Sequence, residues 1–256
     1  MSRNAQVTAG QPESRAAEGI RSLEVRWILP GRSGSAVAGW LGRFPGEVEM
    51  REDVYLLDPD LRGLSVKVRA GRALEVKVYR GSPGVLTVAG GALGRMESWQ
   101  KWSFPCDRLG REDADPVGWM RVRKARRVSR FSLVGGDTGC AVELTAVRAR
   151  EQDWWSLGLE ATGPDEVRHS ELEAAAALVF ARPPPDPTEF GLHASLSYAA
   201  WIRDAVLGRA RRPPRTGPGY ASVQRPAAHS RGAAAVWAAL CPGGRAAYRG
   251  SGLAGG

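Results

Sequence analysis

The stretch LSVKVRAGRALEVKVY (64–79) alternates apolar with charged or polar residues in two short runs that flank a glycine. Alternation with a period of two predicts a β-hairpin that has one apolar and one charged face. A three-residue loop at 70–72 keeps the two faces apart, because it places Lys67 opposite Glu75 and the valines opposite apolar partners. A two-residue loop would mix the faces. The sequence therefore predicts both the hairpin and its register.

The charged face of this hairpin carries Ser65, Lys67, Arg69, Glu75 and Lys77, which are of mixed sign with more bases than acids. On an open sheet such a face looks at water, and its cross-strand pairs contribute roughly 0.2–1 kcal/mol each. In a closed barrel one face of every strand points into the lumen, so the same side chains would line an internal cavity. The number of strands in the rest of the chain decides between these two arrangements.

Strand-like segments follow one another quickly along the chain. Eight are predicted, at 22–29, 47–58, 64–70, 73–79, 97–104, 119–133, 140–149 and 153–161. Helices are predicted at 35–44, 164–181 and 195–210. This pattern favours a mainly β (α+β) fold, an eight-stranded antiparallel tunnel-like β-barrel with helices packed outside. A lumen of that size either fills with side chains or holds one small ligand.

The basic residues are concentrated near one end of the 256-residue chain. Residues 209–256 contain eight Arg and no acid, so the rest of the chain is nearly neutral despite a net charge of +9. The sequence predicts a disordered leader (1–20), a barrel domain (21–208) and an Arg/Ala/Gly/Pro-rich disordered tail (209–256). The basic pI therefore does not indicate nucleic-acid binding by the folded part, and we favour a solvated tail over one that binds RNA.

Apolar stretches and cysteine spacing indicate the compartment in which the chain works. The first nineteen residues contain no apolar stretch of the secretory type, and the longest near-apolar run, 174–181, is too short to span a bilayer. Cys106, Cys140 and Cys241 are far apart and form no CxxC motif, which favours reduced thiols over a zinc site. We expect a cytoplasmic protein without a membrane partner.

Taken in chain order, these segments resemble the CYTH superfamily, the triphosphate tunnel metalloenzymes. This group includes class IV adenylate cyclases, thiamine triphosphatases and inorganic triphosphatases, and the resemblance to a divergent member runs from about Ser22 to Trp201. The residues that carry it are SLEVR (22–26), YLLDPD (55–60), VKVRAGRALEVKV (66–78), KAR (124–126), AVEL (141–144), GLE (158–160) and the pair Ser197 and Tyr198. The fold that the resemblance implies agrees with the independent strand count.

The resemblance also implies a site. Six bases would hold phosphate in the lumen, namely Arg26, Lys67, Arg69, Lys77, Lys124 and Arg126. Three acids, Glu24, Glu143 and Glu160, would bind Mg²⁺ or Mn²⁺. Two carboxylates of the usual set are missing, because Ser22 and Gly158 stand in their places, so the cationic half of the site is better preserved than the metal-binding half.

The sequence predicts a divalent-metal-dependent hydrolase of the triphosphatase type, acting on a triphosphate-containing compound or short polyphosphate. The alternative is a non-catalytic module that binds polyphosphate or organic phosphates and has a degenerate metal site. A third hypothesis is an RNA-associated β-protein that works through its basic tail. No Ser-His-Asp or Cys-His arrangement has recognisable spacing, so no catalytic residue is assigned, and the sequence identifies neither the phosphate compound nor the oligomeric state.

Overall fold

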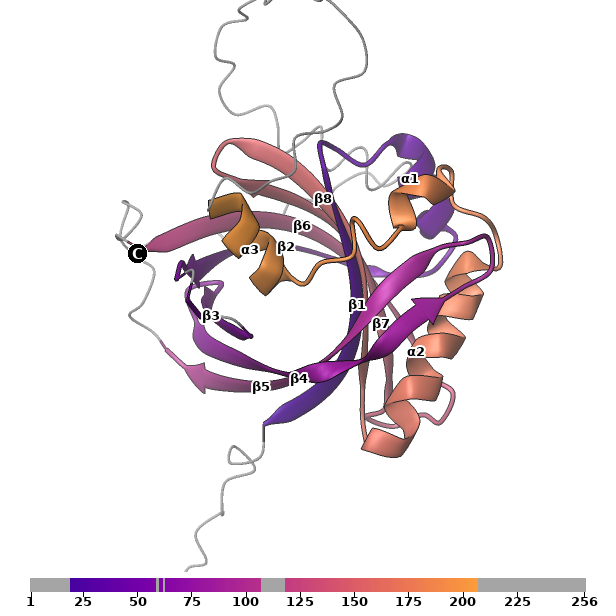
Figure 1. Ribbon diagram of the computed structural model, residues 1–256, viewed down its shortest axis with the longest axis horizontal. Coiled ribbons are helices and arrows are strands. Elements are labelled where there is room, and N and C mark those ends of the chain that lie inside the picture. The colour runs from indigo at the N-terminus through magenta and orange to yellow at the C-terminus, as the bar shows by residue number, and fades with distance from the viewer. Residues whose placement is uncertain (1–18, 59, 62, 107–117, 207–256) are drawn as a thin grey trace, which may run out of the picture.

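The computed structural model describes residues 19–206, apart from 59, 62 and 107–117. Within these residues eight antiparallel strands close into a barrel in the order β1-β5-β4-β3-β2-β6-β7-β8 (Figure 1). The strands are β1 (Ile20–Pro30), β2 (Glu47–Leu56), β3 (Leu64–Arg69), β4 (Ala73–Thr87), β5 (Leu93–Pro105), β6 (Trp119–Phe131), β7 (Gly139–Ala149) and β8 (Gln152–Thr162). The predicted fold class is confirmed, and so is the tunnel-type barrel that the resemblance implied.

The three predicted helices are present in the described part of the chain as α1 (Ser35–Gly42), α2 (Asp165–Phe180) and α3 (Tyr198–Val206), with a short 3-10 helix at Pro187–Phe190. Helix α2 packs against the outside of β1, β7 and β8, and α3 lies across one end of the barrel (Figure 1). No helix in the described ranges is long and apolar enough to cross a membrane. The predicted tail, Cys241 and all of the predicted leader except residues 19 and 20 lie outside the described residues.

The hairpin of β3 and β4 has the predicted register. Lys67 pairs with Glu75 and the flanking apolar positions pair with each other. The loop residues Ala70 and Gly71 both adopt positive φ angles, 50° and 65°, and the Arg72 N–H donates to the carbonyl of Arg69 over 2.9 Å. A glycine relieves the strain of one of the two left-handed positions, so the loop length that the alternation requires is also sterically accessible.

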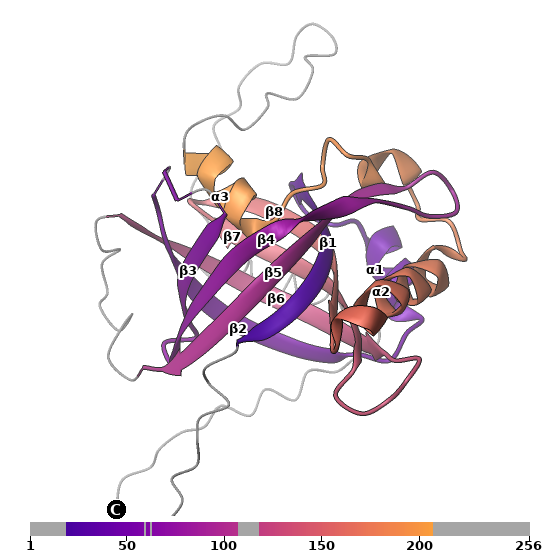
Figure 2. The same cartoon turned by 60° about the horizontal axis from the view of Figure 1, so that its bottom comes forward.

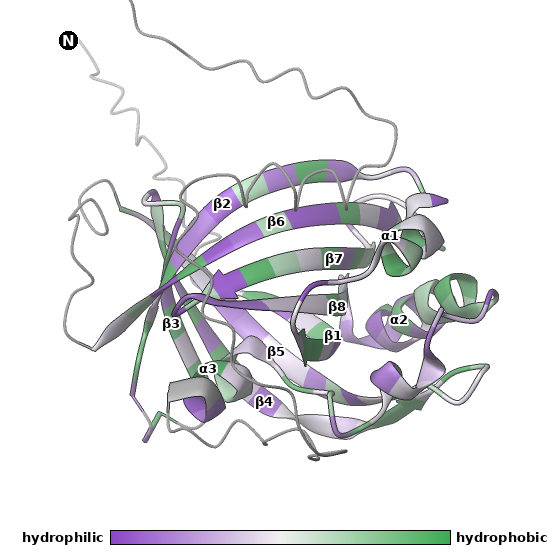
Figure 3. Ribbon diagram, turned by 90° about the horizontal axis from the view of Figure 1, so that it is seen from above, coloured by the Kyte–Doolittle hydropathy of each residue, from purple (hydrophilic) through white to green (hydrophobic). Residues whose placement is uncertain are grey.

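The apolar faces of the strands point outward on the side that the helices cover. Trp27 is fully buried there, with edge-to-face contacts to Phe180 and Phe190, and its Nε1 donates to the carbonyl of Leu93 over 2.9 Å. Figure 3 shows hydrophilic and hydrophobic residues alternating along the strands. The main core thus lies between barrel and helices, which leaves the lumen to the charged face.

The distal parts of β4 and β5 bend away from the barrel toward α2 (Figure 2). The bend follows two register shifts between Tyr79 and Gly84. As β5 departs, its pairing with β1 ends at Glu24 and Glu97. Beyond that point the segment 194–196 continues along β1, where Ile28 N–H donates to the Ala194 carbonyl over 2.9 Å. This segment delivers α3 to the end of the barrel.

Gly94 provides a test of the outer core. A Cβ at this position would collide with Val25 and would lie 2.7 Å from Cζ2 of Trp27. We expect Gly94→Ala to lower the free energy of unfolding by about 1–3 kcal/mol, because the buried indole of Trp27 is packed on all sides and cannot move to make room for the methyl group. The matched control is Gly39→Ala in α1, where nothing lies within 4 Å and the free energy should rise by about 0.5–1 kcal/mol. Urea unfolding with an unchanged m-value measures both, and effects of the same sign would contradict the packing described.

Candidate functional site

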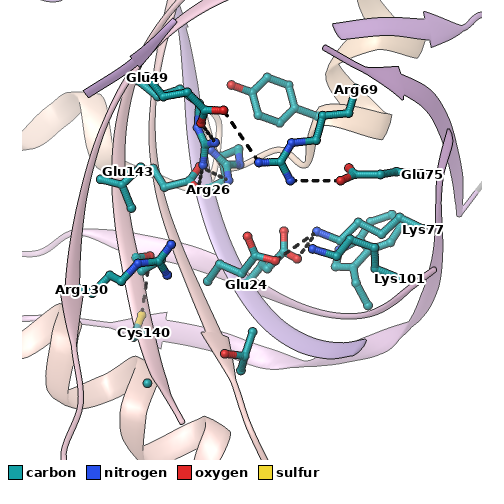
Figure 4. Close-up of a pocket in the computed structure, with 18 of the residues that line it drawn as sticks. Glu24, Arg26, Glu49, Arg69, Glu75, Lys77, Lys101, Arg130, Cys140 and Glu143 are labelled. Atoms are coloured by element: carbon teal, nitrogen blue, oxygen red, sulfur yellow. Dashed lines mark hydrogen bonds and ion pairs between the residues drawn. The ribbon is translucent and has the colours of Figure 1, made fainter. Parts of the chain in front are cut away.

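The barrel encloses a cavity of about 790 Å³ whose wall is dominated by charged side chains. Nine bases line it: Arg26, Arg51, Lys67, Arg69, Lys77, Lys101, Lys124, Arg126 and Arg130. Seven acids join them: Glu24, Glu47, Glu49, Glu75, Asp137, Glu143 and Glu160. The charged side chains that Figure 4 labels project into the cavity from several strands. A cavity of this size and composition suits a small anion better than an apolar ligand.

The structure brings every sequence-predicted site residue into this one cavity. The six bases assigned to phosphate and the three acids assigned to metal all line it, and so do Ser197 and Tyr198 at the start of α3. The charged face of the β3–β4 hairpin is therefore an inner face. The roles of these residues in binding remain predictions, because their position alone does not define a ligand.

Strand β2 contributes charged residues that the sequence interpretation missed. Glu47, Glu49 and Arg51 line the cavity, and Asp53 lies fully buried among the bases of the cavity wall. The sequence contained the pattern that predicts this, because EVEMREDVY (47–55) places these charged residues at alternate positions, on one face of a strand. The resemblance drew attention only to the end of this strand. Lys101 and Arg130 were also missed, although each has the same parity as its inward-facing neighbours.

Asp53 is the anionic centre of the deepest group of bases. Its carboxylate lies 3.1 Å from Nζ of Lys124, and 3.3 Å from both Nζ of Lys67 and Nε of Arg51. Burial raises the pKa of Asp53, but the three cations outweigh burial and hold that pKa well below its usual range. Asp53 is therefore ionised, and it neutralises part of the charge of the bases around it.

Aromatic rings cover this deep end of the cavity. Nζ of Lys124 lies 3.8 Å from the ring centre of Tyr198 and 2.6 Å from the hydroxyl of Tyr55, and Cζ of Arg26 lies 4.7 Å from the Tyr198 ring centre. Burial raises the pKa of Tyr198, while Lys124 and Arg26 lower it, and the net shift is downward. Since Tyr198 begins α3, that helix contributes directly to the wall of the site and favours cations beside it.

Midway along the cavity, acids and bases alternate in close contact. Glu143 lies 3.3 Å from Nη2 of Arg26 and also contacts Arg126, whose Nη1 donates to Glu49 over 2.7 Å. On the opposite wall Glu75 contacts Lys67 and Arg69 of β3, at 3.0 Å in each case. Each of these acids already has a cationic partner, so an incoming cation would have to compete with a base for it.

The three acids predicted to bind metal do not form a divalent-cation site as they are arranged. Glu24 and Glu160 are neighbours across β1 and β8, but the ammonium of Lys77 contacts both of them, at 3.7 Å in the case of Glu160. Glu143 is held separately by two arginines. In the described part of the chain no group of three or more His, Cys, Asp or Glu side chains is placed to hold a metal ion. The residues present therefore do not fit the metal that the resemblance implied.

Arg26, on the neighbouring strand β1, fills the space beside Gly158, where the resemblance would place a carboxylate. Gly158 pairs with Arg26, and a Cβ at position 158 would lie 2.5 Å from Cζ of that arginine. The guanidinium thus occupies the space that a side chain at 158 would need. At the other departure, the hydroxyl of Ser22 donates to Glu24 over 2.6 Å. An uncharged hydroxyl at position 22 thus stands where the resemblance would place a second carboxylate beside Glu24.

Fold and site together define a closed antiparallel barrel with a charged lumen. No protein-family model matches the chain, and no match is found among curated proteins. Similar solved structures include the Pct1 RNA triphosphatase of S. pombe (10% identity, 62% of this chain and 79% of that chain, TM-score 0.37). Others are a Mimivirus capping enzyme triphosphatase (13%, 60% and 87%, 0.36) and a conserved hypothetical protein from Pyrococcus furiosus (15%, 61% and 90%, 0.36). At such low identity and TM-score, only the lumen itself can indicate a function.

The ion pairs of the hairpin make stability depend on acidity. Burial raises the pKa of Glu75, but Lys67 and Arg69 outweigh burial and lower that pKa to about 2. Because the pKa is lower in the folded chain than in the unfolded chain, the stabilisation is complete above about pH 4.3 and disappears as the pH falls toward 2. We expect Glu75→Gln to be less stable than wild type at pH 7 and to lose less stability on acidification. Urea unfolding at a series of pH values measures this, and parallel curves for both proteins would contradict the assignment.

Proposed function

We propose that the lumen binds a polyphosphate-type anion, such as a linear triphosphate, without a divalent cation. The observation that carries this proposal is the convergence of nine bases on one enclosed cavity in which they outnumber the acids. Guanidinium groups match phosphate oxygens in a bidentate way and ammonium groups act as point charges, so a mixture of both suits a chain of phosphates. A monovalent anion would leave most of these bases unused.

Two of the lumen bases are available without rearrangement. Lys101 on β5 and Arg130 on β6 form no ion pair among the described residues. They lie on different walls of the cavity (Figure 4), and Lys101 stands directly opposite Lys77 in the register of β4 and β5. Like charges opposite one another are unfavourable in a sheet, and here the carboxylates of Glu24 and Glu160 offset the charge of Lys77. A phosphate group placed there would interact chiefly with Lys101.

Other bases can exchange partners at modest cost. Arg69 is 37% exposed; its Nη1 lies 3.0 Å from Glu75, and its Nη2 lies 3.9 Å from Glu49, which is 43% exposed. Half-exposed ion pairs contribute little stability, about 0–1 kcal/mol. Arg69 can therefore leave Glu49 for a phosphate oxygen, whereas the fully buried pairs around Asp53 stay in place. We infer that the ligand binds in the more exposed part of the lumen, above the Asp53 group.

Metal-dependent hydrolysis, the other predicted function, requires a cation that polarises the terminal phosphoryl group. The predicted ligands are each in contact with a base of the lumen, which favours binding without turnover. RNA binding through the basic tail concerns residues outside those described.

Ligand binding can be tested by thermal unfolding in the presence of EDTA. Tripolyphosphate at about 100 times its Kd should raise the Tm by roughly 5–10 °C, since ligands that bind only the folded state stabilise it. The double variant Lys101→Gln/Arg130→Gln should lose most of this shift. Its matched control is Arg123→Gln on β6, whose side chain is 73% exposed on the outer face and contacts Glu52. Sulfate at equal ionic strength controls for general salt effects. If no polyphosphate raises the Tm of the wild type, the proposed function is wrong.

Turnover is tested separately with the same full-length protein. Phosphate release from tripolyphosphate, thiamine triphosphate and ATP is measured with Mg²⁺ or Mn²⁺. We expect no release above that of Lys124→Ala, which removes a buried lumen base 3.1 Å from Asp53. Metal-dependent release that disappears in this variant would instead establish the hydrolase.

A further inference from the structure

One lysine of the lumen has an unusual position for a phosphate-binding base. The ammonium of Lys77 contacts the carboxylates of Glu24 and Glu160, and it extends from β4 past the intervening strand β5 to reach them (Figure 4). Its side chain is only 23% exposed, and the contact with Glu24 is a hydrogen bond. Lys77 therefore lines the cavity while its ammonium contacts two acids.

The two acids alone would repel each other. Glu24 and Glu160 are directly paired in the register of β1 and β8, and side chains of like charge at such positions destabilise a sheet. The hydroxyl of Ser22 is the other polar group bonded to Glu24, and it carries no charge. A cation between the carboxylates is thus a requirement of this part of the barrel, and Lys77 supplies it.

The third acid is neutralised in the same way by a different residue. Arg26 contacts Glu143 and occupies the space beside Gly158 where a further carboxylate would otherwise project. Both groups of acids in this region are therefore satisfied by cations that belong to the chain. Lys101, which stands opposite Lys77, forms no ion pair with these acids among the described residues, although its charge also lowers the pKa of Glu160.

We propose that Lys77 is a built-in substitute for a divalent cation: its ammonium holds the place between Glu24 and Glu160, keeps metal out of the lumen, and leaves the remaining bases to the anion. This inference rests on the proposed function for its meaning, because it explains why polyphosphate would bind without metal. Its geometric consequence is independent of any ligand. Removal of the Lys77 side chain should convert the acid pair into a site for Mn²⁺, a hard cation that prefers carboxylate oxygens.

The experiment measures Mn²⁺ binding to the full-length protein by electron paramagnetic resonance, with no polyphosphate present. Wild type should leave Mn²⁺ in solution. Lys77→Ala and Lys77→Ser should each bind one Mn²⁺ with an affinity roughly tenfold or more above that of the wild type, and Mn²⁺ should raise their Tm. Both variants leave two carboxylates side by side without a cation, so without metal their Tm should be lower than that of the wild type. Mn²⁺ should restore it.

The matched control is Lys101→Ala, which removes the same charge from the position directly opposite Lys77 and should create no Mn²⁺ site. Adding Glu24→Gln to Lys77→Ala should abolish the new site. Stoichiometric Mn²⁺ binding by wild type that Glu24→Gln removes would overturn the inference, and so would Lys77 variants that neither bind Mn²⁺ nor regain stability with it. Because polyphosphate is absent, these outcomes are distinguishable from failure of the proposed function.

Discussion

Neutralisation of charge inside a closed barrel is the constraint on which the rest of this structure depends. A buried charge without a partner is destabilising by several kcal/mol, so acids and bases that share the lumen must meet one another. Asp53 satisfies this requirement for the deepest bases, and Glu143 does so for the two arginines midway along the cavity. The same constraint puts the apolar faces of the strands outside, where α2 and the buried Trp27 form the core.

The ion pairs of the lumen differ in how firmly they are held. Asp53 and Lys124 are 0% and 2% exposed, and such pairs are strongly coupled because little water reaches them. Toward the exposed part, Arg69 and Glu49 are half-exposed, and Lys101 and Arg130 form no ion pair among the described residues, although the charge of Lys101 acts on Glu160. The exposure of the ion pairs therefore increases from the Asp53 group toward Arg69 and Glu49. An anion in the lumen would interact most favourably with the bases whose present ion pairs are weakest.

The departures from the resembled pattern are linked by space and charge. Arg26 occupies the space beside Gly158, so a carboxylate could return at 158 only if the guanidinium moved. Ser22 contributes a hydrogen bond to Glu24 where a second acid would add repulsion to the pair with Glu160. Lys77 then balances the acids that remain. The site is thus a consistent arrangement with internal cations, and single substitutions back to acids would disturb several contacts at once.

The distal parts of β4 and β5, at 80–87 and 93–96, were not predicted, but the sequence by itself determined the existence of eight strands, the register of the hairpin at 64–79 and the side chains that share its charged face. These properties are local, because a period of two and a short loop fix them within a few residues. The same alternation in 47–55 contained Asp53, but nothing local distinguishes a solvent-facing aspartate from one surrounded by three bases. Only the tertiary structure decided that Lys77 contacts Glu24, 53 residues away in the chain, and that Arg26 occupies the space beside Gly158. Barrel closure brings these residues together, so whether the acids are free for a metal depends on contacts that no single strand contains.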